Sequence, residues 1–381
     1  MIKIALLGST GSIGRQALEI IDRYPDKFKI VSMSAGSNAT LFEAQLNKYK
    51  PSIATFSSSE RAHLIKEIPK ETSLYLGENS LVHAVTGDCD LVFDAVMGFA
   101  GLKAVKEAIA LKKNIALANK ETLVAGGGLV MPMAKSAGVS VIPVDSEHSA
   151  IWQCLNFNSN KPYKKIIITA SGGAFRDTPL SELDTVTFES ALKHPNWNMG
   201  NKITIDCATM MNKGFEVIEA MWLFGAKRSD IEVVVHPESI IHSLVEFSDG
   251  AVLSQMGEPS MLVPISLALT YPERLETGVK PLALAGKTLT FKELDLNRYP
   301  CFALCDRAIE LGYNYPCALS GADEQAVSLF LQGKIKYTDI YRLIEKALEK
   351  TQKQELSFDS LYETDKLARV AVLEKYRRIK C

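Results

Sequence analysis

The chain has 381 residues with 47% hydrophobic and 23% charged side chains, a composition typical of a globular protein of two or three domains. Its 43 basic residues nearly balance its 44 acidic residues, so the net charge of −1 does not indicate a nucleic acid or an anionic membrane surface as partner. No apolar run approaches the roughly 18 residues that a membrane-spanning helix needs. Seven scattered cysteines without a Cys-x-x-Cys pair are typical of reduced thiols, so we expect a cytoplasmic protein.

The chain opens with a strand, a glycine-rich turn and a helix. Ile2–Leu7 is a continuous apolar run of the kind found in parallel sheets, and a helical pattern covers Arg15–Arg23. Between them, Gly8-Ser-Thr-Gly11-Ser-Ile-Gly14 places glycines three apart, which lets the backbone approach a pyrophosphate at the helix N-terminus. The order of these elements predicts dinucleotide binding, for which a glycine-rich turn alone is weak evidence.

The second strand, Lys29–Ser34, bears on the choice of cofactor. Enzymes that select NAD usually place an acid after this strand to bind the ribose 2′-hydroxyl, and this chain has no acid between Lys29 and Leu41. We therefore predict NADP, although the loop Gly36-Ser37-Asn38 offers no basic side chain for the 2′-phosphate.

Alternating strand and helix patterns continue to residue 145 and predict a doubly wound parallel sheet. Polar clusters follow the strand ends, and in such a sheet the carboxyl ends of the strands share one edge, where ligands bind. We expect further strands at 53–56, 91–95, 114–118 and 139–142, a helix at 102–112, and convergence of Gly8–Gly14, Gly36–Asn38, Asn119–Glu121 and Asp145–Glu147.

Two of these clusters have an ordinary alternative as helix starts. Asn119 is a good N-cap, but the helix dipole disfavours Lys120 in a first turn, and a lysine there suits an anionic substrate better. Asp145 and Glu147 also suit a helix start; as metal ligands, two residues apart, they point the same way only if the chain is extended. With Glu216 they would form an all-oxygen set that selects Mg²⁺ or Mn²⁺.

The middle of the chain carries three further candidates. Ser171-Gly172-Gly173 follows the strand Lys165–Ala170 and is either a phosphate-binding nest or a plain turn. The loop 193–200 contains Trp197 and Met199, which either anchor it or close over a ligand, while His194 could be an ordinary buried histidine. In a helix from about residue 210, four polar side chains fall within an arc of about 120° and face a site or solvent: Asn212, Lys213, Glu216 and Glu219.

The remaining patterns concern packing. His236 and His242 are six apart, which does not make one helical face, so we expect structural histidines among strands near 233–235, 243–247 and 251–255. Residues 264–295 lack a clear period and predict a linker. Helical patterns at 301–311, 325–331, 340–350 and 366–378 predict a small bundle.

Six motifs in order along the chain carry a resemblance: Gly8-Ser-Thr-Gly-Ser-Ile-Gly14, Ala118-Asn-Lys-Glu121, Pro143-Val-Asp-Ser-Glu-His148, Ala170-Ser-Gly-Gly173, His194-Pro-Asn-Trp-Asn-Met199 and Ala208-Thr-Met-Met-Asn-Lys-Gly214. Together they resemble the 1-deoxy-D-xylulose 5-phosphate reductoisomerases. This resemblance implies an NADPH-dependent and Mn²⁺- or Mg²⁺-dependent oxidoreductase of isoprenoid precursor synthesis. It would rearrange and reduce a small phosphorylated sugar to 2-C-methyl-D-erythritol 4-phosphate, as a homodimer.

The resemblance also implies roles for individual residues. The metal ligands would be Asp145, Glu147 and Glu216, with Lys120 and His194 completing the catalytic set. Trp197 and Met199 would form a lid. Substrate contacts would come from Lys120, Ser146, Glu147, Ser171, His194, Cys207, Asn212, Lys213 and Glu216, and NADPH contacts from Thr10, Gly11, Ser12, Ile13, Gly36, Ser37, Asn38, Asn119, Glu121 and Gly200.

Two positions depart from the family pattern. Cys207 stands where the family commonly has serine, and its S–H is a weak donor to a phosphate. Ser37 stands where relatives can carry a basic residue. We expect a Rossmann-like domain at 1–144, an α+β catalytic, metal-binding and dimerisation domain at 145–265, a linker at 266–295 and a helical bundle at 296–381. The alternatives are a metal-independent dehydrogenase of the semialdehyde or homoserine type, and a nucleotide-binding module without turnover.

Overall fold

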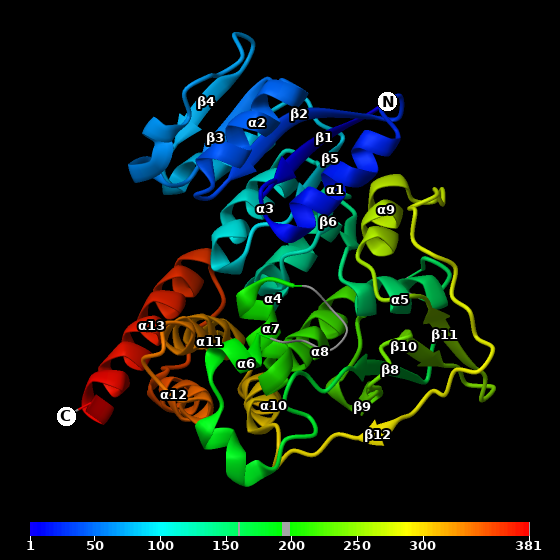
Figure 1. The fold of residues 1–381 in the computed structure, drawn as a ribbon, viewed down its shortest axis with the longest axis vertical. Helices are drawn as coiled ribbons and strands as arrows, with labels where there is room; N and C mark the ends of the chain where they lie inside the picture. Colours follow the sequence, from blue (N-terminus) through cyan, green and yellow to red (C-terminus); the bar gives the residue numbers. More distant parts are fainter. Residues whose placement is uncertain (159–160, 193–198, 381) are drawn as a thin grey trace. The chain divides into compact units, whose positions relative to one another are not determined.

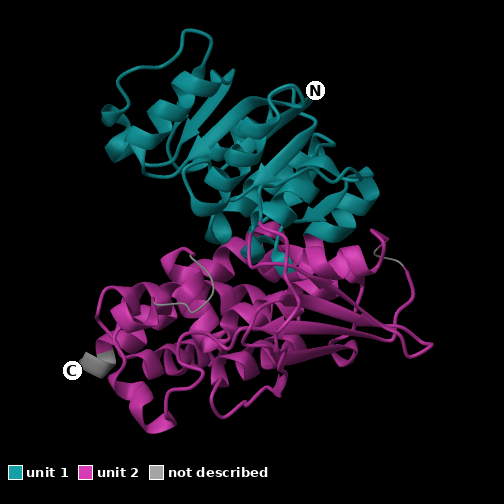
Figure 2. Cartoon of the chain, turned by 45° about the vertical axis from the view of Figure 1, so that its right-hand side comes forward, with its two compact units in different colours: residues 1–122, 130–146, 261–279 teal, residues 123–129, 147–260, 280–381 magenta. Residues whose placement is uncertain are grey.

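A computed structural model describes residues 1–158, 161–192 and 199–380 and divides the chain into two compact units (Figures 1 and 2). Unit 1 comprises residues 1–122, 130–146 and 261–279, and unit 2 comprises residues 123–129, 147–260 and 280–381. In sequence order, the chain therefore returns to unit 1 at residues 261–279, between two long segments of unit 2. Within the described residues, none of the helices combines the length and low charge that crossing a lipid bilayer requires.

Unit 1 is built on a parallel sheet of seven strands in the order β4-β3-β2-β1-β5-β6-β7, the predicted doubly wound arrangement. Its central strands are buried on both faces, which explains their continuous apolar sequences. The strands are β1 (Ile2–Leu7), β2 (Phe28–Ala35), β3 (Ile53–Phe56), β4 (Ser73–Leu76), β5 (Leu91–Asp94), β6 (Asn114–Leu117) and β7 (Val141–Pro143).

Helices and short 3-10 turns connect these strands and enclose a core that includes Leu6, Ile20, Phe42 and Phe93, each fully buried. The helices are α1 (Ser12–Arg23), α2 (Ala39–Tyr49), α3 (Gly101–Ala110), α4 (Lys120–Ala137) and α9 (Leu262–Thr270). The 3-10 turns are η1 (Ser59–Leu64), η2 (Glu78–Val85) and η3 (Gly98–Ala100).

Helix α9 corrects one prediction. Residues 264–270 were expected to begin a linker, yet they lie in α9, which packs on α1 in unit 1. The helix is apolar on all sides and almost entirely buried, so it lacks the amphipathic period by which a surface helix is found. Beyond it, the expected irregular segment contains only the short strand β12 (Lys292–Glu293) among its regular elements.

Unit 2 joins a mixed five-stranded sheet, in the order β11-β10-β8-β9-β12, to helices. The predicted hairpin is confirmed: β10 pairs antiparallel with β11 through the turn at Asp249-Gly250. The strands are β8 (Lys165–Ala170), β9 (Ile231–Val235), β10 (Ile241–Glu246) and β11 (Val252–Met256). The helices that precede or follow them are α5 (Ser146–Cys154), α6 (Phe188–Ala191), α7 (Asn201–Thr209) and α8 (Met211–Phe224). The 3-10 turns are η4 (Leu180–Thr185) and η5 (Arg228–Asp230).

The C-terminal helices form the predicted bundle, with helix ends beyond the predicted bounds. Tyr337 links them to α7, because its hydroxyl donates to the Ala208 carbonyl at 2.6 Å. One apolar cluster runs through these helices and the α7–α8 pair. The bundle helices are α10 (Pro300–Leu311), α11 (Tyr315–Leu331), α12 (Tyr337–Lys350) and α13 (Phe358–Lys380).

Candidate active site

The glycine-rich turn has the backbone geometry that dinucleotide binding requires. Gly8 has φ +79°, and a Cβ at Gly14 would lie 2.2 Å from the Gly8 carbonyl oxygen, so side chains are excluded at both positions. Helix α1 begins directly after Gly11 with no side-chain cap, which leaves its N-terminal N–H groups for a ligand. Thr10, Gly11, Ser12 and Ile13 therefore lie where the sequence predicts them, at a helix N-terminus on the carboxyl edge of the sheet.

Two side chains outside the predicted cofactor contacts hold this turn. The Gln45 side chain, on α2, donates to the Ser9 carbonyl at 3.0 Å and accepts from the Ser9 hydroxyl at 2.7 Å. Ser34, in β2, accepts from the Gly8 N–H at 2.8 Å. Because Asn38 caps α2 by accepting from Leu41 N–H, the same helix carries one predicted cofactor residue and clamps the turn that holds others.

Asn119 acts as the predicted helix cap and makes a second contact. Its side-chain oxygen accepts from the Thr122 N–H at 3.0 Å, and its amide donates to the Gly98 carbonyl at 2.9 Å. The next residue, Lys120, is only 8% exposed and forms an ion pair with Asp145. The asparagine thus caps α4 as predicted. The lysine is paired with Asp145, and its expected contact with an anionic substrate stays a prediction.

The opening of α5 decides the geometry of the acidic motif. Helix α5 begins at Ser146, so Glu147 lies in its first turn. The chain from Asp145 to Glu147 is therefore not extended, which was the condition for the two side chains to point the same way. In unit 2, Lys213 donates to Glu147 at 2.7 Å and also pairs with Glu216. Carboxylate oxygens of Glu147 and Glu216 lie within 4.8 Å of one another.

The polar arc of α8 faces the interior. Asn212, Lys213, Glu216 and Glu219 are exposed by 6%, 3%, 0% and 4%, so the alternative of a solvent-facing stripe is wrong. Asn212 donates to Glu216 at 2.6 Å. Burial alone would lower the pKa of Lys213, but the negative charges of Glu147 and Glu216 outweigh it and raise that pKa, so the ammonium stays charged.

His148 contacts two acidic residues of α8, Glu216 and Glu219. Its ring is fully buried, and Nε2 lies 2.9 Å from the backbone oxygen of Glu216, while Nδ1 lies 3.8 Å from the Glu219 carboxylate. The ring thereby ties α5 to α8 and sets the position of Glu216. Spacing in the sequence could not predict the contact between His148 and Glu216, because 68 positions separate them.

The turn after β8 meets the end of α7. Gly172 and Gly173 both have positive φ, and a Cβ at Gly173 would lie 2.5 Å from the Cys207 carbonyl oxygen. The Ser171 hydroxyl accepts from the Gly173 N–H at 3.2 Å. The nest-like turn that carries Ser171 thus lies against the α7 backbone at Cys207, the other predicted phosphate-contact residue.

Other predicted residues fall into three groups. His194 and Trp197 lie outside the described residues. Met199 is partly buried, and Gly200 caps α7. His236 is structural as expected: its Nε2 accepts from the Ile240 and Ile241 N–H groups at 3.2 Å, and its Nδ1 donates to the Thr290 carbonyl at 2.8 Å.

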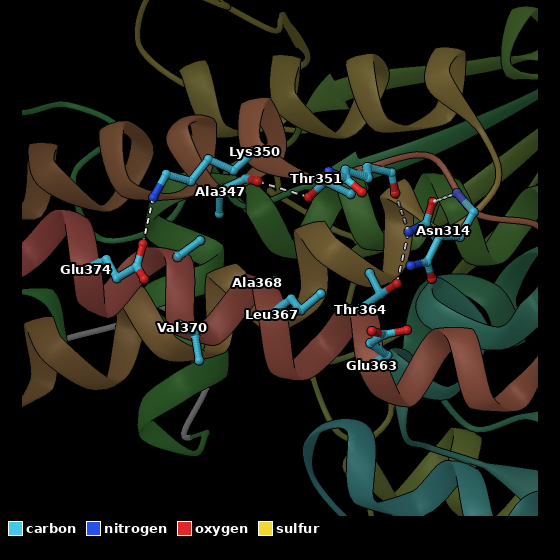
Figure 3. Close-up of a pocket in the computed structure, with 13 residues that line it drawn as sticks. Asn314, Ala347, Lys350, Thr351, Glu363, Thr364, Leu367, Ala368, Val370 and Glu374 are labelled. Atoms are coloured by element: carbon cyan, nitrogen blue, oxygen red, sulfur yellow. Dashed lines mark hydrogen bonds and ion pairs between the residues drawn. The ribbon is translucent and has the colours of Figure 1, made fainter.

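A separate pocket of about 320 Å³ lies in the helical bundle, between α12 and α13 (Figure 3). The Asn314 amide donates at its edge to the Gln352 carbonyl and to the Thr364 hydroxyl, and Lys350 pairs with Glu374 across it. None of the predicted site residues that the structure describes lines this pocket.

Hard carboxylate oxygens fit a divalent cation. Glu147 and Glu216 converge on one positive charge, the Lys213 ammonium, which offsets only part of their negative charge. Asp145, the third predicted metal ligand, lies two residues before Glu147 in the sequence. A doubly wound sheet with a glycine-rich turn after its first strand, together with buried acids and lysines, defines a nucleotide-dependent α/β oxidoreductase.

Comparison with known proteins identifies the family. Three family models match: 1-deoxy-D-xylulose 5-phosphate reductoisomerase over residues 4–127, its C-terminal domain over 141–224, and the DXP reductoisomerase C-terminal domain over 256–371. The chain belongs to the 1-deoxy-D-xylulose 5-phosphate reductoisomerase family.

Individual relatives agree over nearly the whole chain. The reductoisomerase of Nostoc sp. PCC 7120 is 47% identical over 98% of this chain and 96% of its own length, and that of Pelotomaculum thermopropionicum is 48% identical over 97% of both. Among solved structures, a DOX-P reductoisomerase in complex with NADPH, fosmidomycin and magnesium matches with a TM-score of 0.95 at 37% identity, covering 100% of this chain and 99% of the other. The Zymomonas mobilis enzyme in complex with NADPH matches with a TM-score of 0.90 at 37% identity, over 98% and 99%. These findings do not favour the metal-independent dehydrogenase.

Proposed function

We propose that this chain rearranges 1-deoxy-D-xylulose 5-phosphate and reduces it to 2-C-methyl-D-erythritol 4-phosphate, with NADPH as hydride donor and a divalent cation. The observation that carries the proposal is the pairing of buried Glu216 and partly buried Glu147 with Lys213 in a member of the reductoisomerase family. An ordinary alcohol or semialdehyde dehydrogenase has no need of two converging carboxylates, whereas a reaction that moves a carbon–carbon bond needs charge stabilisation on neighbouring oxygens.

The metal would be held by Glu147 and Glu216, with Asp145, two residues before Glu147, as the third ligand. When bound, a divalent cation polarises the carbonyl and hydroxyl oxygens of the substrate. The protein's contribution is positional, because His148 fixes the backbone of Glu216 and Asn212 donates to its carboxylate.

The remaining assignments follow the family motifs. Ser146, Lys120, Asn212 and Lys213 would donate to or accept from substrate oxygens, and Ser171 with Cys207 would meet the phosphate. His194 would complete the catalytic set. NADPH would lie along the carboxyl edge of unit 1's sheet, at Thr10–Ile13, Gly36–Asn38, Asn119 and Glu121, with Gly200 contributing from α7. Trp197 and Met199 would cover the reactants.

The proposed roles of the chain's segments follow from these residues. Residues 1–144 would bind cofactor, 145–265 would carry the metal and substrate groups, and 296–381 would brace them. The packing of Tyr337 against Ala208, and of α10 against α8, supports the bracing role.

We further propose a homodimer, use of manganese as well as magnesium, and a cytoplasmic location. Strand β11 is a sheet edge and exposes Val252 and Leu253 by 49% and 48%, which suits pairing with a second copy. The six cysteines in the described part of the chain are all free, as expected in a reducing compartment. Light scattering of the purified protein tests the dimer.

Mn²⁺ binding followed by electron paramagnetic resonance tests the metal site. Glu216→Gln keeps the shape of the side chain but removes its charge, and should weaken Mn²⁺ binding by about tenfold or more. Glu232→Gln, on an exposed acid paired with Lys165, is the matched control and should bind like the wild type. Equal Mn²⁺ affinity in wild type and Glu216→Gln would contradict the assignment.

A further inference from the structure

Asp94 is an acid that neither the motifs nor the proposed mechanism uses. It ends β5, next to β1 at the centre of unit 1's sheet, and is 0% exposed. One carboxyl oxygen accepts from the Val96 N–H at 3.1 Å, and the other has no hydrogen-bond partner among the described residues. A carboxylate in such a place is poorly stabilised, whereas a neutral acid is tolerated.

The surroundings also favour the neutral form. The charged side chain acting on Asp94 is another acid, Glu121, from the first turn of α4. The first residue of α3, Gly101, and the N-cap of α4, Asn119, lie on the same side as its unpaired oxygen, and neither carries a charge. Burial, and then the charge of Glu121, raise the pKa of Asp94 to about 7, against the Val96 N–H, which lowers it.

Asp94 is in tight contact with two parts of the cofactor edge. It pairs in register with Leu7, and the carbonyl oxygen of the next residue, Ala95, lies 2.5 Å from where a Cβ of Gly8 would be. A Cβ at Gly101 would lie 2.9 Å from Asp94 Oδ2 and 2.5 Å from Asn119 Nδ2. The glycine-rich turn thus lies against the backbone at the end of β5, and Gly101 leaves space that the side chains of Asp94 and Asn119 border.

We propose that Asp94 is a positioning residue for NADPH, and that only its neutral, protonated form supports tight binding. The inference rests on the proposed cofactor site. Ionised Asp94 would place a second buried negative charge beside Glu121, at an edge that must accept a polyanion. Asp94 touches no reacting atom, so its effect falls on cofactor affinity and not on the chemical step.

The test is the dissociation constant of NADPH at about pH 6 and about pH 8.5, for the wild type and Asp94→Asn. Asparagine has the same size and cannot ionise. If only the neutral form binds tightly, the wild-type Kd should rise about tenfold or more relative to that of Asp94→Asn between the two pH values. Ionisation of NADPH itself is common to both proteins and cancels in this ratio. Asp88→Asn, on an exposed acid paired with Lys3, should keep the wild-type profile.

Parallel pH profiles for wild type and Asp94→Asn, with NADPH bound tightly by both, would overturn the role of Asp94 and leave the proposed function intact. Failure of every protein to bind NADPH at either pH would overturn the proposed cofactor site and this inference with it. Should Asp94→Asn not fold, Asp94→Ser, which is also neutral, is measured in its place. A kcat that falls while the NADPH KM stays constant would contradict a positioning role.

Discussion

Replacing Lys213 by methionine tests whether the buried acids are built for a cation. Lys213 has a side chain only 4% exposed and pairs with Glu216, which is 1% exposed, and with Glu147, which is 19% exposed. Removing one partner of a buried ion pair costs about 3–5 kcal/mol. Glu216 keeps its hydrogen bond from Asn212 and Glu147 is partly solvated, so we expect the lower end, about 3 kcal/mol, in metal-free protein.

The metal should compensate for this loss. Mn²⁺ supplies the positive charge that methionine lacks, so the difference in unfolding free energy from the wild type should shrink to under about 1 kcal/mol in saturating Mn²⁺. Urea unfolding in EDTA and then in Mn²⁺ measures both values. Lys346→Met, which breaks an exposed pair with Glu349, should cost at most about 0.5 kcal/mol in either condition. An equal loss with and without Mn²⁺ would refute the reasoning.

Four further outcomes follow from the structure. Gly173→Ala should raise the KM for the phosphorylated substrate, because its Cβ has no space and its φ is positive. The control Gly250→Ala also has a positive φ but open space around it, so it should leave this KM unchanged. Equal KM values in the two variants would count against the phosphate turn. Cys207→Ser should leave that KM equal or lower, since a hydroxyl is the better donor, and a raised KM would exclude a phosphate contact there. Gln45→Ala should raise the NADPH KM severalfold with little change in kcat, because it removes both bonds to the turn, and steady-state kinetics with an unchanged NADPH KM would refute the clamp. Folding raises the pKa of Asp94 from 3.8 to about 7, so the folded state binds the extra proton and wild-type stability falls as pH rises from about 4 to about 7. Asp94→Asn removes this loss and should be the more stable protein at pH 8, by up to about 4 kcal/mol in urea unfolding. Equal slopes of stability against pH in the two proteins would contradict this prediction.

Elements with a clear hydrophobic pattern were predictable from the sequence. β1, β3 and β8 begin and end where their apolar runs do, because each is a short strand inside a sheet. Elements without such a pattern were not. α9 is buried on all sides, the first half of α11 is small and apolar all round, and β4 is an exposed strand at a sheet edge with no alternation.

The candidate site divides in the same way. The polar arc of α8 could be read from spacing alone, because four polar side chains share one face of an otherwise apolar helix. Glu147 and Glu216 could be grouped from their chemistry as oxygen ligands and from the family motifs, but not from spacing, because they lie far apart in the chain. The contacts of His148 and Gln45 could not be predicted, because each joins elements far apart in the chain and the residue type is ordinary where it stands.

The most direct test of the central claim is the oxidation of NADPH on addition of 1-deoxy-D-xylulose 5-phosphate, before and after removal of metal. We expect turnover in Mg²⁺ or Mn²⁺, its loss after treatment with EDTA, and its recovery when the metal is returned. Glu216→Gln should lose turnover in all three conditions while still binding NADPH. Turnover that persists after complete metal removal, or NADPH that is never consumed with this substrate, would contradict the account.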